Sequence, residues 1–184
     1  MGISVRDRAD TVATFRFINV YLMETLAGWV PTTPEMEVKV LFGRHLWDLA
    51  QHADAFGKRT GELRLGLHAS RQPVSDFMAV LKRVSSAEDT SERVDGFYAA
   101  ITSVLQRLYG RYLDETDLLM DEPTVRIVER AMADLTRMCR EREELRKERP
   151  EIALADDGWV QQLTTTADAG AEFVNFRPEP QEAA

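Results

Sequence analysis

The sequence predicts an all-α fold built around four long helices, and three observations support this prediction. Apolar residues recur at helical spacing over long segments. No segment shows the alternation of apolar and polar residues that is typical of strands, and proline or glycine marks the ends of the long segments. With 184 residues, 44% of them hydrophobic and 29% charged, the chain has the length and composition of one globular domain.

The four long helices are expected over residues 8–30, 33–56, 92–119 and 123–149. The first should end at the Pro31–Pro34 segment, since proline interrupts a helix. Gly57 is the expected end of the second helix, and Pro123 and Pro150 bound the fourth. A short extra helix is predicted over residues 76–84.

The character of the sequence changes at Pro150. Residues 1–150 are expected to form the helical bundle, and residues 151–184 an irregular acidic extension that packs on the bundle or on a partner subunit. The extension has seven acidic residues and one basic residue, Arg177, so it carries most of the net charge of −8. A nearly neutral body with an acidic extension is a poor electrostatic match for nucleic acid.

Cysteine content and the N-terminal segment favour a cytoplasmic location. Cys139 is the only cysteine, so the chain cannot form an internal disulfide or a cysteine-based zinc knuckle. Residues 1–10 lack the apolar core of a secretory signal. The apolar segment 11–30 contains Arg16, Asn19 and Glu24, which argues against a membrane-spanning helix. No membrane association is therefore expected.

Two histidines lie on the apolar face predicted for the second helix. At about 100° per residue, His45 and His52 share that face with several core residues, and Asp48 lies at its edge. The apolar members of the face are Val38, Leu41, Leu49 and Phe56. Because polar groups are costly in a core, we expect His45, Asp48 and His52 to form a polar centre inside the bundle.

Carboxylates on the first and fourth helices are expected to join this centre. The first helix is apolar on nearly all sides, so Glu24 is predicted to be buried. Glu129 lies beside the apolar stripe of the fourth helix and is a weaker candidate. Carboxylate and imidazole groups suit iron, manganese or zinc. The candidate metal ligands are therefore Glu24, His45, Asp48, His52 and Glu129.

Each of these positions also has a simpler structural interpretation. The two histidines are compatible with hydrogen-bonded core residues. Asp48 is compatible with an ion pair to Arg44, and Glu24 with an ion pair to Arg16. A functional centre is favoured because four polar side chains that are costly to bury point into the interior of one bundle. They are Glu24, His45, Asp48 and His52.

Two segments resemble bacterial ferritin-like proteins of poorly defined role. They are LFGRHLWDLAQHADAFGKRTGELR (Leu41–Arg64) and DEPTVRIVERAMAD (Asp121–Asp134). Together with the four long helices, they make residues 8–149 similar to the ferritin-like superfamily. The resemblance implies a ferritin-like four-helix bundle with the short extra helix and the extension added to it.

The resemblance does not extend to a complete di-iron centre. Di-iron members supply a Glu from each of two helices and a Glu-x-x-His motif from each of the other two. Glu24 matches the first-helix ligand, but Phe42 and Leu49 stand three residues before the two histidines. The fourth helix has Glu129-x-x-Met132 and no histidine. The resemblance therefore implies a half-site, an altered mononuclear metal site, or a pocket that no longer binds metal.

Three functional hypotheses follow. The first is an atypical metal-dependent oxidoreductase or oxygenase acting on a small molecule, with iron or manganese in the polar centre and His45 and His52 as catalytic residues. The second is a metal-free helical binding or scaffolding protein without catalysis. The third is a metal-independent enzyme that uses either histidine as acid or base. A homodimer would use one side of the second helix, formed by Gly43, Trp47, Ala50 and Asp54.

Overall fold

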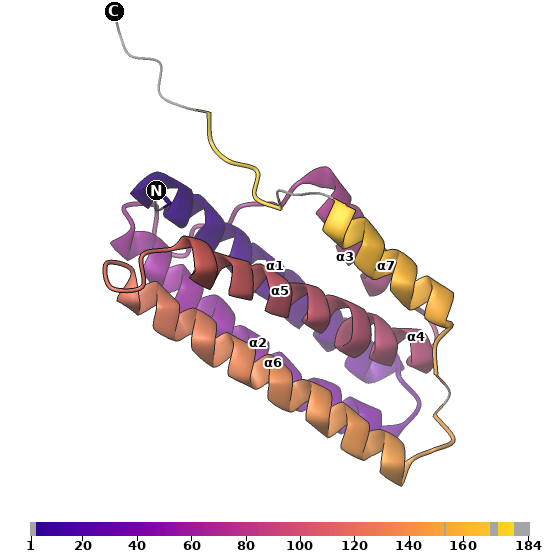
Figure 1. Cartoon of the computed structure of the whole chain (residues 1–184). Helices are drawn as coiled ribbons and strands as arrows, with labels where there is room; N and C mark the ends of the chain where they lie inside the picture. Colours follow the sequence, from indigo (N-terminus) through magenta and orange to yellow (C-terminus); the bar gives the residue numbers. More distant parts are fainter. Residues whose placement is uncertain (1–2, 153, 170–172, 179–184) are drawn as a thin grey trace, which may run out of the picture.

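The computed structural model describes residues 3–152, 154–169 and 173–178, and the regular elements in these ranges are all helical. Four long helices run side by side in Figure 1: α1 (Val5–Thr32), α2 (Met36–Glu62), α5 (Thr102–Glu115) and α6 (Glu122–Glu148). The prediction of an all-α fold is confirmed.

The shorter helices complete one side of this arrangement. They are α3 (Ser75–Ser85), α4 (Thr90–Asp95), the π-helix η1 (Gly96–Ile101) and α7 (Asp157–Ala169). In Figure 1, α3 and α7 lie together beside the long helices, and α7 contacts η1 as well as α3. α4 and η1 lead directly into α5, so the third predicted helix is one segment with a π-turn inside it.

α2 continues past Gly57, which the sequence predicted as its end. The loop after α2 folds back over this glycine, and the His68 backbone N–H donates a hydrogen bond to the Gly57 carbonyl at 2.8 Å. A β-carbon at residue 57 would collide with the His68 ring. Gly57 therefore makes room for the returning loop and does not end the helix.

The C-terminal extension is more regular than the sequence predicted. Asp156 Oδ1 accepts a hydrogen bond from the Trp159 backbone N–H at 2.9 Å, which caps the start of α7. The Trp159 ring packs over Gly96, where a β-carbon would lie 2.8 Å from Trp159 Cη2. Leu163 is buried on the same helix. The prediction of an irregular extension was wrong over α7, whereas residues 170–172 and 179–184 lie outside the described ranges.

Two buried aspartates attach the segments after α6 to the bundle. Asp95 Oδ2 accepts a hydrogen bond from the Ala155 backbone N–H at 2.7 Å, and Asp95 Oδ1 lies 2.6 Å from Arg146 Nη2. Asp10 accepts a hydrogen bond from the Arg177 backbone N–H at 2.9 Å. Buried carboxylates need such partners, so these contacts fix the path of the chain around the bundle.

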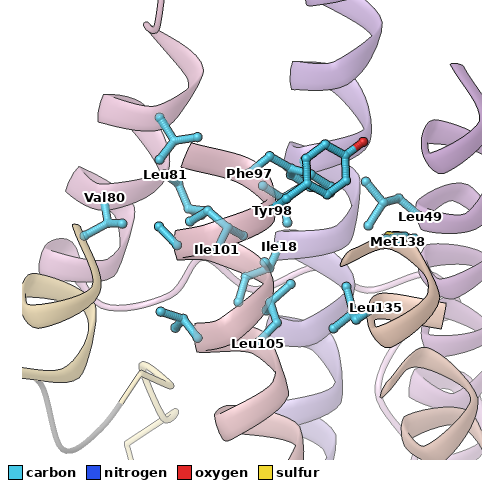
Figure 2. Packing of buried hydrophobic residues seen from close by; sticks show 14 of the residues in the cluster. Ile18, Leu49, Val80, Leu81, Phe97, Tyr98, Ile101, Leu105, Leu135 and Met138 are labelled. Atoms are coloured by element: carbon cyan, nitrogen blue, oxygen red, sulfur yellow. The ribbon is translucent and has the colours of Figure 1, made fainter. Parts of the chain in front are cut away.

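The apolar core lies between the long helices and α3. Figure 2 shows side chains from several helices converging, among them Ile18, Leu49, Leu81, Ile101 and Leu135. Each such residue stabilises the fold by about 1.5–3 kcal/mol when fully buried. The Tyr98 ring belongs to this cluster, but its hydroxyl lies at the edge, where polar residues of α2 and α6 begin.

Candidate functional site

The structure brings three predicted site residues together on the face of α2 that packs against α6. Both histidines are buried, with exposed fractions of 0% and 2%, and Asp48 is half-buried between them. On α6, Asp134, Arg137 and Glu141 lie opposite these three residues. We call these six residues the α2–α6 seam: His45, Asp48 and His52 of α2, and Asp134, Arg137 and Glu141 of α6.

Both ring nitrogens of His45 have hydrogen-bond partners. Nε2 lies 3.1 Å from Glu141 Oε2, and Nδ1 lies 2.7 Å from the Tyr98 hydroxyl of η1. A carboxylate only accepts hydrogen bonds, so Nε2 carries the proton and the Tyr98 hydroxyl donates to Nδ1. His45 therefore joins α2, η1 and α6 and has no nitrogen left for another ligand.

His52 has one engaged and one unengaged nitrogen. Nε2 lies 3.0 Å from Asp134 Oδ2, so by the same argument Nε2–H donates to that carboxylate. Nδ1 is buried without a hydrogen-bond partner in the described part of the chain. Asp48 Oδ2, one turn earlier, forms an ion pair with Arg137 Nη2 at 2.9 Å.

Arg137 is the cation shared by the carboxylates of the seam. Besides Asp48, its guanidinium lies 3.0 Å from Asp134 Oδ1 and 3.2 Å from Glu141 Oε1. Arg44 adds a second cation, with Nη1 at 2.7 Å from Glu141 Oε2. Burial alone would raise the pKa of Glu141, but hydrogen bonds from Arg44, His45 and Arg137 outweigh it and lower that pKa to about 2.

Both histidines are neutral in the folded protein at neutral pH. Burial lowers the pKa of His45 and of His52 below the ordinary histidine value, although Glu141 and Asp134 act in the opposite direction. Burial would raise the pKa of Asp134, but its bonds to His52 and Arg137 outweigh this effect and lower it. The seam is therefore built from neutral imidazoles, ionised carboxylates and one central guanidinium.

These shifts predict that acid destabilises the fold. Below about pH 6.5 the two histidines bind more protons in the unfolded chain than in the folded protein. The free energy of unfolding therefore falls as the pH is lowered. The lowered pKa values of Asp134 and Glu141 act in the same direction below about pH 4.5. Urea unfolding at several pH values measures this, and His52→Gln should flatten the dependence between about pH 7 and about pH 5.5. A free energy that stays constant or increases on acidification would contradict this account.

Glu24 and Glu129 lie outside the seam, and both are exposed. The expectation that Glu24 is buried was wrong, because only one side of α1 is covered near this residue. Leu22 and Leu26 are buried on the covered side, whereas Glu24 faces a surface hollow. The alternative ion pairs of Asp48 with Arg44 and of Glu24 with Arg16 do not occur among the described residues.

The seam does not fit a metal centre. Within residues 3–152, 154–169 and 173–178, no three His, Cys, Asp or Glu side chains are placed to hold a metal ion. Asp48 Oδ2 and His52 Nδ1 offer two ligand atoms, whereas catalytic zinc sites, for comparison, use three protein ligands. Arg137 lies between the carboxylates, where it supplies the positive charge that a metal ion would otherwise supply.

Sequence analysis missed half of the site. Asp134, Arg137 and Glu141 of α6, and Tyr98 of η1, were not among the residues predicted for the site. One signal was present, because the residues of α6 in the seam repeat the three-then-four spacing of those of α2. Two matching faces of this kind predict an antiparallel ladder, with His45 opposite Glu141 and His52 opposite Asp134.

Comparisons with known proteins assign the chain to no family. No protein-family model matches it, and no curated protein and no solved structure is significantly similar to it. None of the helices that the structure describes has the length and hydropathy needed to cross a membrane. Fold and site together define an all-α protein in which two buried histidines, three half-buried carboxylates and a half-buried arginine join α2 to α6.

Proposed function

We propose that this protein is a metal-free, ferritin-like helical scaffold that pairs with a second copy of itself through α2. In this proposal the α2–α6 seam is a structural lock and not a catalytic centre. The observation that supports it is the ladder in the seam, in which each of the three seam residues of α2 has a partner on α6. The three rungs are His45 with Glu141, Asp48 with Arg137 and His52 with Asp134.

The ladder favours a role in helix register over catalysis. A general acid or base must reach a proton on its substrate, but both Nε2 atoms are engaged with carboxylates and His52 Nδ1 is buried. Sliding α6 by one turn along α2 would break all three rungs at once. Buried polar pairs are known to specify register in this way, at some cost in stability.

The outer face of α2 carries an exposed apolar row next to the seam. Met36, Val40 and Trp47 have exposed fractions of 66%, 56% and 64%, and Gly43 is exposed between them. The spacing of four, three and four residues places them on one side of the helix. We call these four residues the α2 row. An exposed apolar row of this kind is typical of a protein–protein interface.

The α2 row is complementary to itself. A β-carbon at Gly43 would meet no atom within 4 Å, so the helix surface one turn from the exposed Trp47 side chain is open to a partner. A two-fold axis between these positions would place each Trp47 over Gly43 of the other copy. This antiparallel pairing would bury the exposed Trp47 ring of both copies, which favours a second copy as the partner.

Sedimentation velocity over a range of protein concentrations tests the pairing. The wild-type chain is expected to form dimers, and Trp47→Asp is expected to be monomeric with an unchanged helical circular dichroism spectrum. The matched control is Leu119→Asp, since Leu119 is 84% exposed but lies in the loop between α5 and α6. A wild-type chain that stays monomeric, or a Trp47→Asp variant that still dimerises, would overturn the proposed interface.

A further inference from the structure

A surface hollow of about 430 Å³ lies beside the C-terminal half of α1. Glu24 and Trp29 of α1 line one side of it, and Ser85 and Arg93 line the other. The volume is within the range of about 300–1,000 Å³ that small-molecule sites occupy in proteins. The hollow does not share a residue with the α2–α6 seam or the α2 row.

Arg93 is a buried cation without an anion. Its exposed fraction is 8%, and it donates hydrogen bonds from Nε to the Ala87 carbonyl at 3.1 Å and from Nη1 to Thr33 Oγ1 at 3.0 Å. Its guanidinium carbon lies 5.9 Å from the centroid of the Trp29 ring. In the described part of the chain, no carboxylate lies within ion-pair distance and no group accepts a hydrogen bond from Nη2. Buried charges are normally paired, so Arg93 is suited to bind an anionic group.

Glu24 provides a carboxylate in the lining of the same hollow. It is exposed, and it has no hydrogen bond or ion pair with any described residue. Although Glu24 and Arg93 line one hollow, their charged atoms are not within 4.0 Å of each other. Among the described residues the two opposite charges form no ion pair with each other, and both line the hollow, where one ligand could contact them.

Gly28 also lines the hollow. A β-carbon at Gly28 would meet no atom within 4 Å, so the surface there is open. Trp29 Nε1–H donates a hydrogen bond to the Ser85 carbonyl at 3.4 Å, and the Tyr21 hydroxyl lies 3.0 Å from Ser85 Oγ. These bonds hold the aromatic side of the hollow against the end of α3.

We infer that this hollow binds a small zwitterion of the amino-carboxylate class, such as a free α-amino acid. The ligand carboxylate lies against the Arg93 guanidinium and its ammonium group against Glu24. A simple anion is repelled by Glu24 and a simple cation by Arg93, so a molecule that carries both charges is selected. The inference rests on α1 and α4 and is independent of the pairing proposed for α2.

Nuclear magnetic resonance titration tests this inference directly. The probe is the Trp29 indole N–H resonance, assigned with Trp29→Phe, and the ligands are the twenty common L-amino acids, each at millimolar concentration. At least one is expected to shift this resonance in a saturable manner. The amine without the carboxylate, and the acid without the amine, are expected to bind about tenfold more weakly or worse.

The decisive variant is Glu24→Gln, since Glu24 is exposed and contributes no contact to the fold. This substitution should weaken binding of the amino acid about tenfold, whereas Glu129→Gln on α6 should leave it unchanged. The inference is overturned if no amino acid shifts the Trp29 resonance. It is equally overturned if Glu24→Gln binds as tightly as the wild type, or if the acid without the amine binds as tightly as the amino acid.

Discussion

Replacing Asp121 with alanine is expected to lower the free energy of unfolding by about 3–5 kcal/mol. The carboxylate is fully buried and accepts hydrogen bonds from the hydroxyls of Tyr112 at 2.5 Å, Thr124 at 2.6 Å and Thr116 at 3.0 Å. Arg59 Nη2 lies 3.0 Å away. Alanine would remove one of the two carboxylates paired with this guanidinium, the other being Glu62, and would leave three hydroxyls without their acceptor, at one end of the bundle where α2, α5 and α6 meet.

Chemical denaturation with urea measures this loss. Asp114→Ala is the matched control, since Asp114 is an exposed acid at the end of the same α5 helix, and its loss should change the free energy of unfolding by about 0.5 kcal/mol at most. If the two variants are equally stable, the Asp121 cluster does not hold the end of the bundle together.

Replacing Arg137 with methionine is expected to cost about 1.5–3 kcal/mol, a smaller effect because the guanidinium is 30% exposed and partly screened by solvent. Methionine keeps much of the apolar volume but leaves Asp48, Asp134 and Glu141 without their shared cation. The same change removes a positive charge that lowers the pKa of His45, so this pKa should rise.

Urea unfolding and histidine titration by nuclear magnetic resonance measure the two effects together. Arg140→Met is the control, because Arg140 lies on α6 outside the seam and its side chain is 68% exposed. A loss of stability without a change in the His45 pKa would mean that Arg137 contributes packing alone. An Arg137→Met variant as stable as Arg140→Met would show that the seam does not lock the two helices.

The sequence was sufficient for the helices because long apolar periodicity needs no knowledge of tertiary contacts. Prediction from the sequence failed where a residue's role depends on a contact with a distant part of the chain. Gly57 resembles a helix end, but it makes room for the His68 loop. Asp156 caps the start of α7. This helix is stabilised by the packing of Trp159 over Gly96, and these two residues are far apart in the sequence.

The site was predictable on α2 and not beyond it. The apolar face of α2 correctly indicated that His45 and His52 are buried. Apolar residues around Glu24 indicated burial in the same way, but helical phase does not reveal which side of α1 lacks a neighbour. The role of Arg137 could not be read from a charged segment, because an arginine on a solvated face and one that neutralises a seam have the same local sequence.

We propose that Arg137, and not a metal ion, balances the carboxylates of the α2–α6 seam. Metal analysis by mass spectrometry on untagged protein, grown in medium supplemented with iron and manganese, tests it most directly. The account predicts iron and manganese well below stoichiometric amounts, unchanged in His52→Ala. Stoichiometric metal in the wild type that is lost in a folded His52→Ala variant would contradict the account and restore the oxidoreductase hypothesis.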